Sequence, residues 1–178
     1  PNAILGKIMS SQKTIVTSIV FTLWVFCAQQ VATAGEKGTF DFVQSISITN
    51  QMAIEQVDHK MIGIVGSGTM TISKSDGGPF EEGSSATLSV IAYIKQTNDG
   101  MNLESPIVVE DASGDKLFMV MRRSTGTFDT GGGGQGRAEL AGGTGKFLGL
   151  TGSCPYEVTF LEGGNVVVRA TQCDWNKS

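Results

Sequence analysis

Alternating apolar and polar residues along much of the chain predict β-strands with one buried face. The alternation is clear over residues 40–49, where apolar side chains occupy mostly even positions, and it repeats over residues 69–74. Apolar runs at residues 86–95, 107–111 and 116–123 complete the predicted central strands, and the last of them has apolar residues on both faces.

Turn-forming residues separate these runs. The stretches at residues 75–79, 98–100 and 113–115 are built from Gly, Asp, Asn, Ser and Pro. We expect about eight to ten strands, and no amphipathic helical stretch of about 11 residues or more is present in the sequence. The fold class is therefore all-β, an antiparallel barrel or a sandwich, and we favour a closed barrel because closure removes exposed strand edges.

The amino-acid composition argues against several other structural classes. Glycine makes up 24 of 178 residues, about 13% against a usual value of about 7%, which argues against a helical bundle. Only 4 prolines are present and the glycines fall in clusters, so a collagen-like chain is excluded. With 40% hydrophobic residues and a net charge of −4, disorder is not expected.

Two segments of the sequence allow predictions beyond the strand pattern, one about a loop and one about the core. Residues 124–136, with four consecutive glycines, predict a flexible loop or a mobile lid. Met119 and Met121, together with Phe118, are interpreted as core filling because methionine suits irregular interiors.

The first 34 residues have the order of a secretory signal peptide. Lys7 and Lys13 precede an almost uncharged apolar run at residues 15–28, and Ala32 and Ala34 provide the small residues of a cleavage site. A membrane anchor is the alternative, but a span needs about 20 apolar residues. We expect cleavage after Ala34 and a single secreted or periplasmic domain at residues 35–178.

The residues of this leader also bear on lipid attachment and on the net charge of the mature chain. Met9 is a plausible initiator, and Phe26 before Cys27 argues against lipid attachment. Without Lys7 and Lys13, the 13 basic residues become 11 against 17 acidic ones, a net charge of about −6. Such a chain is not expected to bind nucleic acid or to insert stably into a membrane after cleavage, and its oligomeric state is left open.

A disulfide is predicted between the two cysteines of the mature chain. Cys154 and Cys173 flank two β-rich runs joined through Gly163-Gly164, which is a hairpin signal. If the turn is centred on that pair, opposed residues have numbers that add up to 327, as those of the two cysteines do. Opposed residues lie at a separation that a disulfide bridges, and two free buried thiols are the alternative.

Candidate catalytic residues are few. His59 is the only histidine, so any acid–base role for a histidine belongs to it, and a solvated or structural histidine is the simpler interpretation. Its neighbour Asp58 should point to the opposite face of a regular strand. Glu55 and Asp111 are the carboxylates that would transfer a proton if they were buried in a cavity.

The sequence gives no ground for a metal or a cofactor. Zinc requires several His or Cys ligands, and the calcium candidates Asp76, Asp99, Asp111 and Asp115 lack the spacing of a ligand loop and are interpreted as turn residues. Glycine spacings near residues 131–136 fit a dinucleotide loop, but no helix-length segment follows them. We therefore expect no metal and no cofactor.

One glycine-rich segment is similar to a segment of known proteins. It spans residues 141–152 and has the sequence Ala-Gly-Gly-Thr-Gly-Lys-Phe-Leu-Gly-Leu-Thr-Gly. The segment resembles one found in dirigent proteins and in allene oxide cyclases, which share an eight-stranded antiparallel barrel. The matching positions are the small residues Gly142, Gly143, Gly145 and Gly149, which permit a tight reversal, and Phe147, which is expected to resume a strand facing inward.

The resemblance implies a barrel with an apolar mouth that holds a small hydrophobic molecule. Proteins of this kind cyclise or orient reactive organic intermediates with few acid or base groups. The resemblance assigns no catalytic residues to this chain, because the match does not extend beyond the glycine segment. Three functions follow: binding of a small hydrophobic ligand, which we favour, a cyclase or isomerase activity, and a structural or protein-interaction module.

Overall fold

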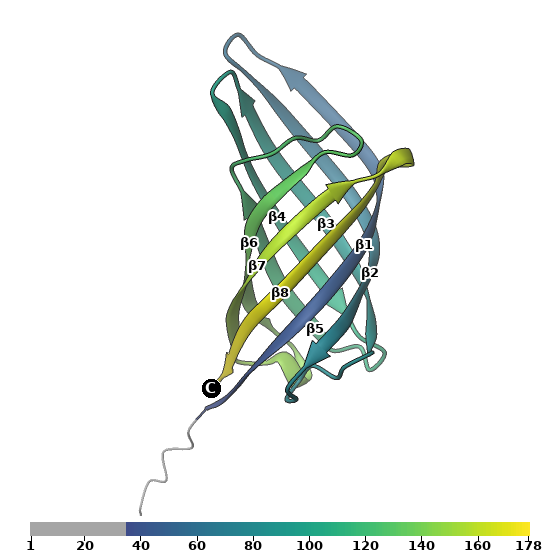
Figure 1. Ribbon diagram of the computed structural model, residues 1–178, viewed down its shortest axis with the longest axis vertical. Coiled ribbons are helices and arrows are strands. Elements are labelled where there is room, and N and C mark those ends of the chain that lie inside the picture. The colour runs from purple at the N-terminus through teal and green to yellow at the C-terminus, as the bar shows by residue number, and fades with distance from the viewer. Residues whose placement is uncertain (1–34) are drawn as a thin grey trace, which may run out of the picture. The chain divides into compact units, whose positions relative to one another are not determined.

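The structure, a computed structural model, describes residues 35–178. Within that range eight strands form one closed antiparallel barrel in which each strand pairs with its neighbours in the sequence and β8 pairs with β1 (Figure 1). The strands are β1 (Glu36–Glu55), β2 (His59–Ser75), β3 (Ser85–Thr97), β4 (Gly100–Glu110), β5 (Lys116–Arg123), β6 (Gly133–Gly143), β7 (Leu150–Phe160) and β8 (Asn165–Lys177).

The expected all-β barrel is confirmed, and the sandwich is not formed. The run at residues 107–111 extends one residue too far, because β4 ends at Glu110. The predicted strand at residues 86–95 lies within β3, and β5 coincides with the predicted run at residues 116–123. The alternation explains why: the even-numbered residues Phe40, Phe42 and Ile46 of β1 are buried, because successive side chains of a strand point to opposite faces. Gln44 shares that inward face and is fully buried.

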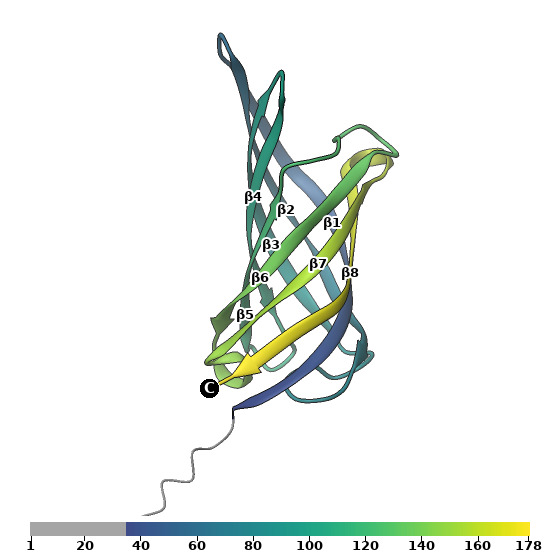
Figure 2. The same cartoon turned by 60° about the vertical axis from the view of Figure 1, so that its left-hand side comes forward.

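The two ends of the barrel are built differently (Figure 2). At one end lie both termini of the barrel domain and the connections at residues 76–84, 111–115 and 144–149. At the other end, hereafter the rim, lie the β1–β2 and β3–β4 hairpins, the loop at residues 124–132 and the β7–β8 turn. The long β1–β2 and β3–β4 hairpins extend beyond the other strands at the rim (Figures 1 and 2).

Aromatic side chains fill the end that carries the termini. The rings of Phe40 and Phe80 stack with centroids 3.7 Å apart, and Phe80 also contacts Phe147 and Trp175 at centroid distances of 5.8 and 6.3 Å. All four side chains are at least 95% buried. Aromatic packing therefore fills the centre of this end. A hollow of about 170 Å³ remains beside it, lined by Phe80, Phe147 and the candidate residue Asp111, among others.

The glycine segment makes the reversal between β6 and β7. Gly142, Gly145 and Gly149 have φ of 87°, 52° and 75°, the left-handed region that favours glycine. A Cβ atom on Gly143 would overlap the carbonyl oxygen of Lys116. Phe147 is buried and points inward, but it lies in a 3₁₀ turn (Gly145–Phe147) and not in the following strand, because β7 begins only at Leu150.

Cys154 and Cys173 form the predicted disulfide, with Cα atoms 4.1 Å apart. The predicted register, however, holds only at the far end of the hairpin. Near the turn, pairs such as Val158 and Val168 add up to 326, because Leu161 N–H donates to the carbonyl of Asn165 and the turn is centred on Gly163.

A β-bulge restores the predicted register. One extra residue in β8, between Ala170 and Cys173, shifts the pairing so that Ser153 lies opposite Asp174. The bulge contains Gln172, which has a φ of 57° and donates its backbone N–H to Asp41 Oδ1 at 2.7 Å. The disulfide therefore joins two strands at the point where their ladder is irregular.

Two details of the predicted pattern need correction. The glycine-rich stretch is a loop only over residues 124–132, because Gly133, Gly134 and Gly136 belong to β6 and pair with β7. Phe118 is not core filling: its side chain points outward and is 37% exposed, whereas Met119 and Met121 are buried. Strand alternation separates these neighbours onto opposite faces.

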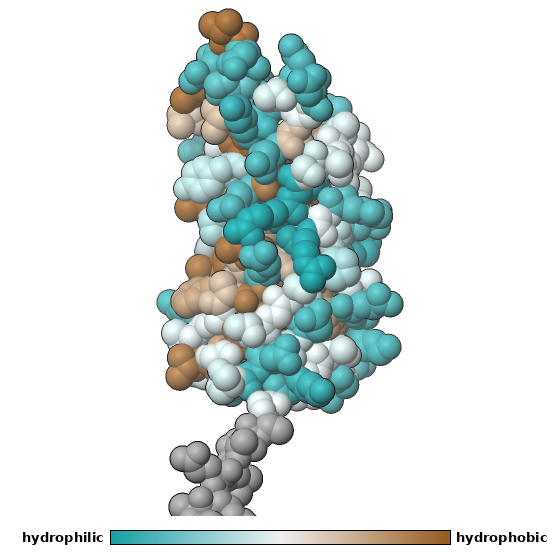
Figure 3. Space-filling view, turned by 90° about the vertical axis from the view of Figure 1, so that its left-hand side faces the viewer, coloured by the Kyte–Doolittle hydropathy of each residue, from teal (hydrophilic) through white to brown (hydrophobic). Residues whose placement is uncertain are grey.

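The outer surface is mixed in character. On the face drawn in Figure 3, hydrophilic side chains form a band through the middle and hydrophobic ones lie in small groups beside it. Arg122 on β5 contributes to the polar surface by pairing with Glu104 and Glu139. No helix among residues 35–178 has the length and apolar character required to cross a bilayer.

Candidate functional site

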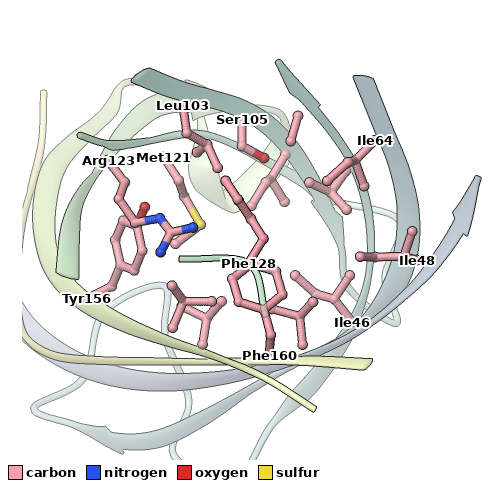
Figure 4. Close-up of a pocket in the computed structure, with 16 residues that line it drawn as sticks. Ile46, Ile48, Ile64, Leu103, Ser105, Met121, Arg123, Phe128, Tyr156 and Phe160 are labelled. Carbon is pink, nitrogen blue, oxygen red and sulfur yellow. The ribbon is translucent and has the colours of Figure 1, made fainter. Parts of the chain in front are cut away.

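An apolar cavity of about 80 Å³ lies inside the barrel toward the rim (Figure 4). Every strand except β6 contributes to its wall, and the loop at residues 124–132 contributes one ring. The lining residues are Ile46, Ile48, Ile64, Val90, Ala92, Leu103, Ser105, Ile107, Met121, Arg123, Phe128, Tyr156, Val158, Phe160, Val166 and Val168.

Phe128 stands between this cavity and a second space of about 100 Å³ nearer the rim. Ile48, Ile64, Phe128 and Phe160 line both spaces. The Phe128 ring is half-buried, packs edge-on against Phe160 at a centroid distance of 5.3 Å, and points into the barrel (Figure 4). Because Phe128 belongs to a loop and not to a strand, it is the element of the wall that can move without breaking the sheet.

Among the described residues, Arg123 is the only charged one in the wall of the apolar cavity. It is the last residue of β5, on the same face as Met119 and Met121, and its side chain is 97% buried. Its Nη1 atom is 3.5 Å from the carbonyl oxygen of Thr127, and within residues 35–178 its Nε and Nη2 atoms have no hydrogen-bond partner. Burial lowers the pKa of the Arg123 guanidinium below its usual value.

Two aromatic rings lie against the Arg123 guanidinium. Its central carbon is 4.8 Å from the centroid of Phe128 and 5.5 Å from that of Phe160. Aromatic faces attract a cation without satisfying its N–H groups. The guanidinium is therefore held in position while most of its hydrogen-bonding capacity is left free.

Glycines make the space that this guanidinium occupies. A Cβ atom on Gly126 or on Gly134 would lie 2.8 or 2.7 Å from Arg123 Nη1, closer than side-chain atoms can approach. Gly136 does the same for Tyr156, since a Cβ there would lie 2.5 Å from the phenol oxygen. A Cβ atom at these positions would also meet a backbone oxygen, that of Gly133, Thr125 or Arg122 respectively, so the glycines permit close approach of backbone as well as room for the two polar side chains.

Tyr156 lies beside Arg123 in the cavity wall (Figure 4). Its hydroxyl donates to the carbonyl oxygen of Arg122 at 3.3 Å. Burial raises the pKa of Tyr156 to about 12, and the nearby charge of Arg123 opposes this only in part. The phenol is therefore neutral at physiological pH. Ser105, the third polar residue, donates its hydroxyl to the carbonyl of Ile91 at 3.1 Å.

The candidate residues His59 and Glu55 meet at the tip of the β1–β2 hairpin, outside the apolar cavity. His59 begins β2, Glu55 ends β1, and Glu55 pairs with Lys60 at 3.0 Å. Asp58 does not point away from His59 as expected: its Oδ1 atom is 2.6 Å from His59 Nδ1. Asp58 lies in the turn before the strand, where strand alternation does not apply.

Asp111, the third candidate, lies at the opposite end of the barrel. Its carboxylate is 2.7 Å from Lys146 Nζ and accepts hydrogen bonds from the backbone N–H groups of Ser113 and Asp115. The hydrogen bond from Lys146 holds the pKa of Asp111 below its usual range. This carboxylate therefore organises the β4–β5 turn and ties it to the glycine segment.

Among the described residues, the four carboxylates weighed as metal ligands do not form one cluster: Asp111 and Asp115 share the β4–β5 turn, and Asp76 and Asp99 lie in other connections. In the range 35–178, no three His, Cys, Asp or Glu side chains gather in a way that would hold a metal ion. Asp76 accepts a hydrogen bond from the backbone N–H of Thr39 at 2.7 Å, and Asp115 accepts one from Lys146 N–H at 3.0 Å.

The residues that define the cavity were not among the sequence candidates. A signal for Arg123 is nevertheless present, because period-two alternation from Leu117 places it on the inward face. An arginine at an inward position of an apolar strand is unusual enough to mark a site. Phe128 carries no comparable signal, because its position depends on the path of the loop. Tyr156 carries none either.

Comparison with known proteins supports the architecture. No family model and no curated protein matches the chain. Among solved structures, the fold is similar to that of a pterocarpan synthase dirigent protein, with a TM-score of 0.50 and 11% sequence identity, over 82% of this chain and 91% of that one. The chain therefore has a dirigent-like barrel fold, as its glycine segment indicated.

Proposed function

We propose that this chain is an exported protein that binds a small hydrophobic molecule inside its barrel. The observation that carries the proposal is the apolar cavity at the rim, lined by residues of seven strands and one loop. Ligand sites in proteins are typically concave and apolar, with a few polar groups that orient the ligand. Arg123, Tyr156 and Ser105 are the polar groups here.

Binding requires the Phe128 ring to move. A cavity of about 80 Å³ is smaller than the space that drug-sized ligands occupy, commonly about 300 Å³ or more. Displacement of the ring would join it to the adjacent space of about 100 Å³. The loop at residues 124–132 would then act as the entrance, with the strands unchanged.

Export is supported by the disulfide and by the leader pattern. The Cys154–Cys173 bond belongs to an oxidising compartment. The predicted signal peptide at residues 1–34 lies outside the described residues and remains a prediction from the sequence. Secretion or periplasmic delivery is therefore part of the proposal.

A cyclase or isomerase activity is the second candidate function. One observation favours it: a neutral phenol and a guanidinium stand side by side in an apolar cavity, where polar groups can orient or polarise a substrate. His59, Glu55 and Asp111 do not line this cavity. An activity of this kind would depend on Tyr156 and Arg123.

Ligand binding is tested by thermal unfolding and calorimetry with a panel of small alcohols and aromatic compounds. A ligand present at about 100 times its Kd adds about 2.7 kcal/mol to the free energy of unfolding, so Tm should rise. Ala92→Leu, which adds carbon atoms within the cavity wall, should abolish the shift. Ala141→Leu, on the exposed face of β6, is the matched control. Absence of binding by the whole panel, with Ala92→Leu more stable than the wild type, would show a packing defect and overturn the proposal.

A further inference from the structure

The buried guanidinium of Arg123 has no counter-ion in the part of the chain that the structure describes. The ion pairs of residues 35–178 include none to Arg123, and its Nε and Nη2 atoms lack any hydrogen-bond partner. The neighbouring arginine, Arg122, points outward and is paired with two glutamates. Arg122 and Arg123 are adjacent in β5, yet among the described residues the charge of Arg122 is paired at the surface and that of Arg123 is buried without a counter-ion.

An uncompensated charge in an apolar interior is costly, and buried charges in proteins are normally paired and hydrogen-bonded. The local structure accommodates this guanidinium: Gly126 and Gly134 leave room for it, and Phe128 and Phe160 face it. Nε and Nη2 lie on one edge of the planar guanidinium, the edge that binds a carboxylate through two parallel hydrogen bonds. Both atoms are fully buried, so a carboxylate reaches them only when a neighbouring ring such as Phe128 moves aside.

We propose that the ligand of the cavity is an amphipathic carboxylate, whose anionic group pairs with Arg123 and whose apolar body packs among the aliphatic side chains of the barrel. This inference rests on the proposed ligand-binding function and adds the charge and the orientation of the ligand. Met121, Tyr156 and Phe160 surround the guanidinium in the cavity wall. The neutral Tyr156 hydroxyl lies beside the bound anion and does not compete with it for the positive charge.

The orientation of the ligand follows from the position of Arg123. This residue ends β5, at the level where the loop with Phe128 begins, and the aliphatic residues Val90, Ile107 and Val168 lie among the cavity walls. The carboxylate of the ligand therefore lies at the loop side, and its hydrocarbon portion occupies the apolar remainder. The paired ligand would also replace the missing counter-ion and so stabilise the loop around it.

The test compares octanoate with octanol at neutral pH, measured by calorimetry on the wild-type protein. The two probes share a chain and differ in the charge of the head group. We expect octanoate to bind about 10 to 100 times more tightly than octanol, as a hydrogen-bonded ion pair in an apolar site implies. Arg123→Met should remove that preference while octanol binding persists, and Arg123→Lys should retain part of it.

Arg122→Met is the matched control, because it removes an arginine from the adjacent outer position and should leave the preference for octanoate unchanged. A second measurement, urea unfolding without ligand, keeps the inference falsifiable. Arg123→Met should be at least as stable as the wild type, because it removes an unpaired buried charge.

The outcomes separate this inference from the proposal on which it rests. Octanol binding with no preference for octanoate would leave the proposed function intact and overturn the anionic ligand. A marked loss of stability in Arg123→Met would assign the guanidinium a structural role and also overturn it. Absence of binding by both probes, together with failure of the wider panel, would overturn the proposed function and the inference together.

Discussion

The guanidinium carbon of Arg123 lies 4.8 Å from the centroid of the Phe128 ring, so a strand residue and a loop residue meet at the mouth of the cavity. The contact joins the charge of the site to the ring that separates its two spaces. A cation–π contact contributes on the order of 1 kcal/mol, enough to hold the loop inward in the absence of ligand but weak enough to release it.

Phe128→Ala is expected to enlarge the binding site. Removal of the ring should lower the free energy of unfolding by about 2 kcal/mol through lost burial and the lost cation–π contact. The joined cavities should accept longer chains, so dodecanol should gain affinity relative to octanol in calorimetry. Phe118→Ala, on the outer face, is the control. An unchanged chain-length preference would contradict the assignment of Phe128 as the separating ring.

Reduction of the Cys154–Cys173 disulfide is expected to lower the free energy of unfolding by roughly 3 kcal/mol, because the reduced unfolded chain gains the entropy of an open loop. The bond joins residues 19 positions apart. Urea unfolding with and without reductant measures the effect. The double variant Cys154→Ser/Cys173→Ser should not respond to reductant, and an equal response would place the effect elsewhere.

The sequence predicts those features of the fold that depend on alternation and turn chemistry. Inward apolar residues at even positions of β1 identify the buried face, and the clusters of Gly, Asp and Ser mark the hairpins. The disulfide is also predictable, because its cysteines flank one hairpin. Its predicted pairing is correct only because the bulge at Gln172 compensates for a turn centred on Gly163 and not between Gly163 and Gly164. The local sequence contains no signal that predicts the bulge at Gln172.

The site is less predictable because it depends on distant segments that meet inside the barrel. His59 and Glu55 are candidates by residue type, yet they lie at the tip of the β1–β2 hairpin and do not line the apolar cavity. Arg123, by contrast, is ordinary by residue type and becomes significant through its inward position. The glycines at residues 131–136 predict flexibility, whereas β6 uses several of them to make room for side chains of β5 and β7.

Stability is expected to fall at alkaline pH through Tyr156. Burial raises the pKa of Tyr156 to about 12 from an ordinary value near 10.0. The folded state therefore retains its proton when the unfolded chain has lost it. This contribution is fully present below about pH 10 and is lost as pH rises through about 12, up to about 2–3 kcal/mol.

The measurement for this titration is urea unfolding of the wild type and of Tyr156→Phe across the alkaline range. Phenylalanine cannot ionise, so the wild type should lose stability relative to the variant as pH rises above about 10. Curves that stay parallel over this range would show that the phenol ionises equally well in the folded and unfolded states.

Gly136→Ala is expected to destabilise the protein by about 1–3 kcal/mol, because overpacking forces neighbouring groups to shift. The added Cβ would lie 2.5 Å from the Cζ and hydroxyl oxygen of Tyr156 and would also meet the carbonyl of Arg122. Gly63→Ala is the matched control: it also lies within a strand, and a Cβ there meets nothing within 4 Å. That substitution should be neutral or stabilising by about 0.5–1 kcal/mol.

A double-mutant cycle separates the two neighbours of Gly136. Tyr156→Phe removes the hydroxyl but leaves the backbone of Arg122, so it should recover part of the loss caused by Gly136→Ala. Urea unfolding of the two single variants and the double variant gives the coupling energy, expected at about 0.5 kcal/mol or more. Strict additivity would mean that the loss caused by Gly136→Ala comes from the backbone of Arg122 and the ring carbon of Tyr156, both of which Tyr156→Phe retains, and not from the hydroxyl.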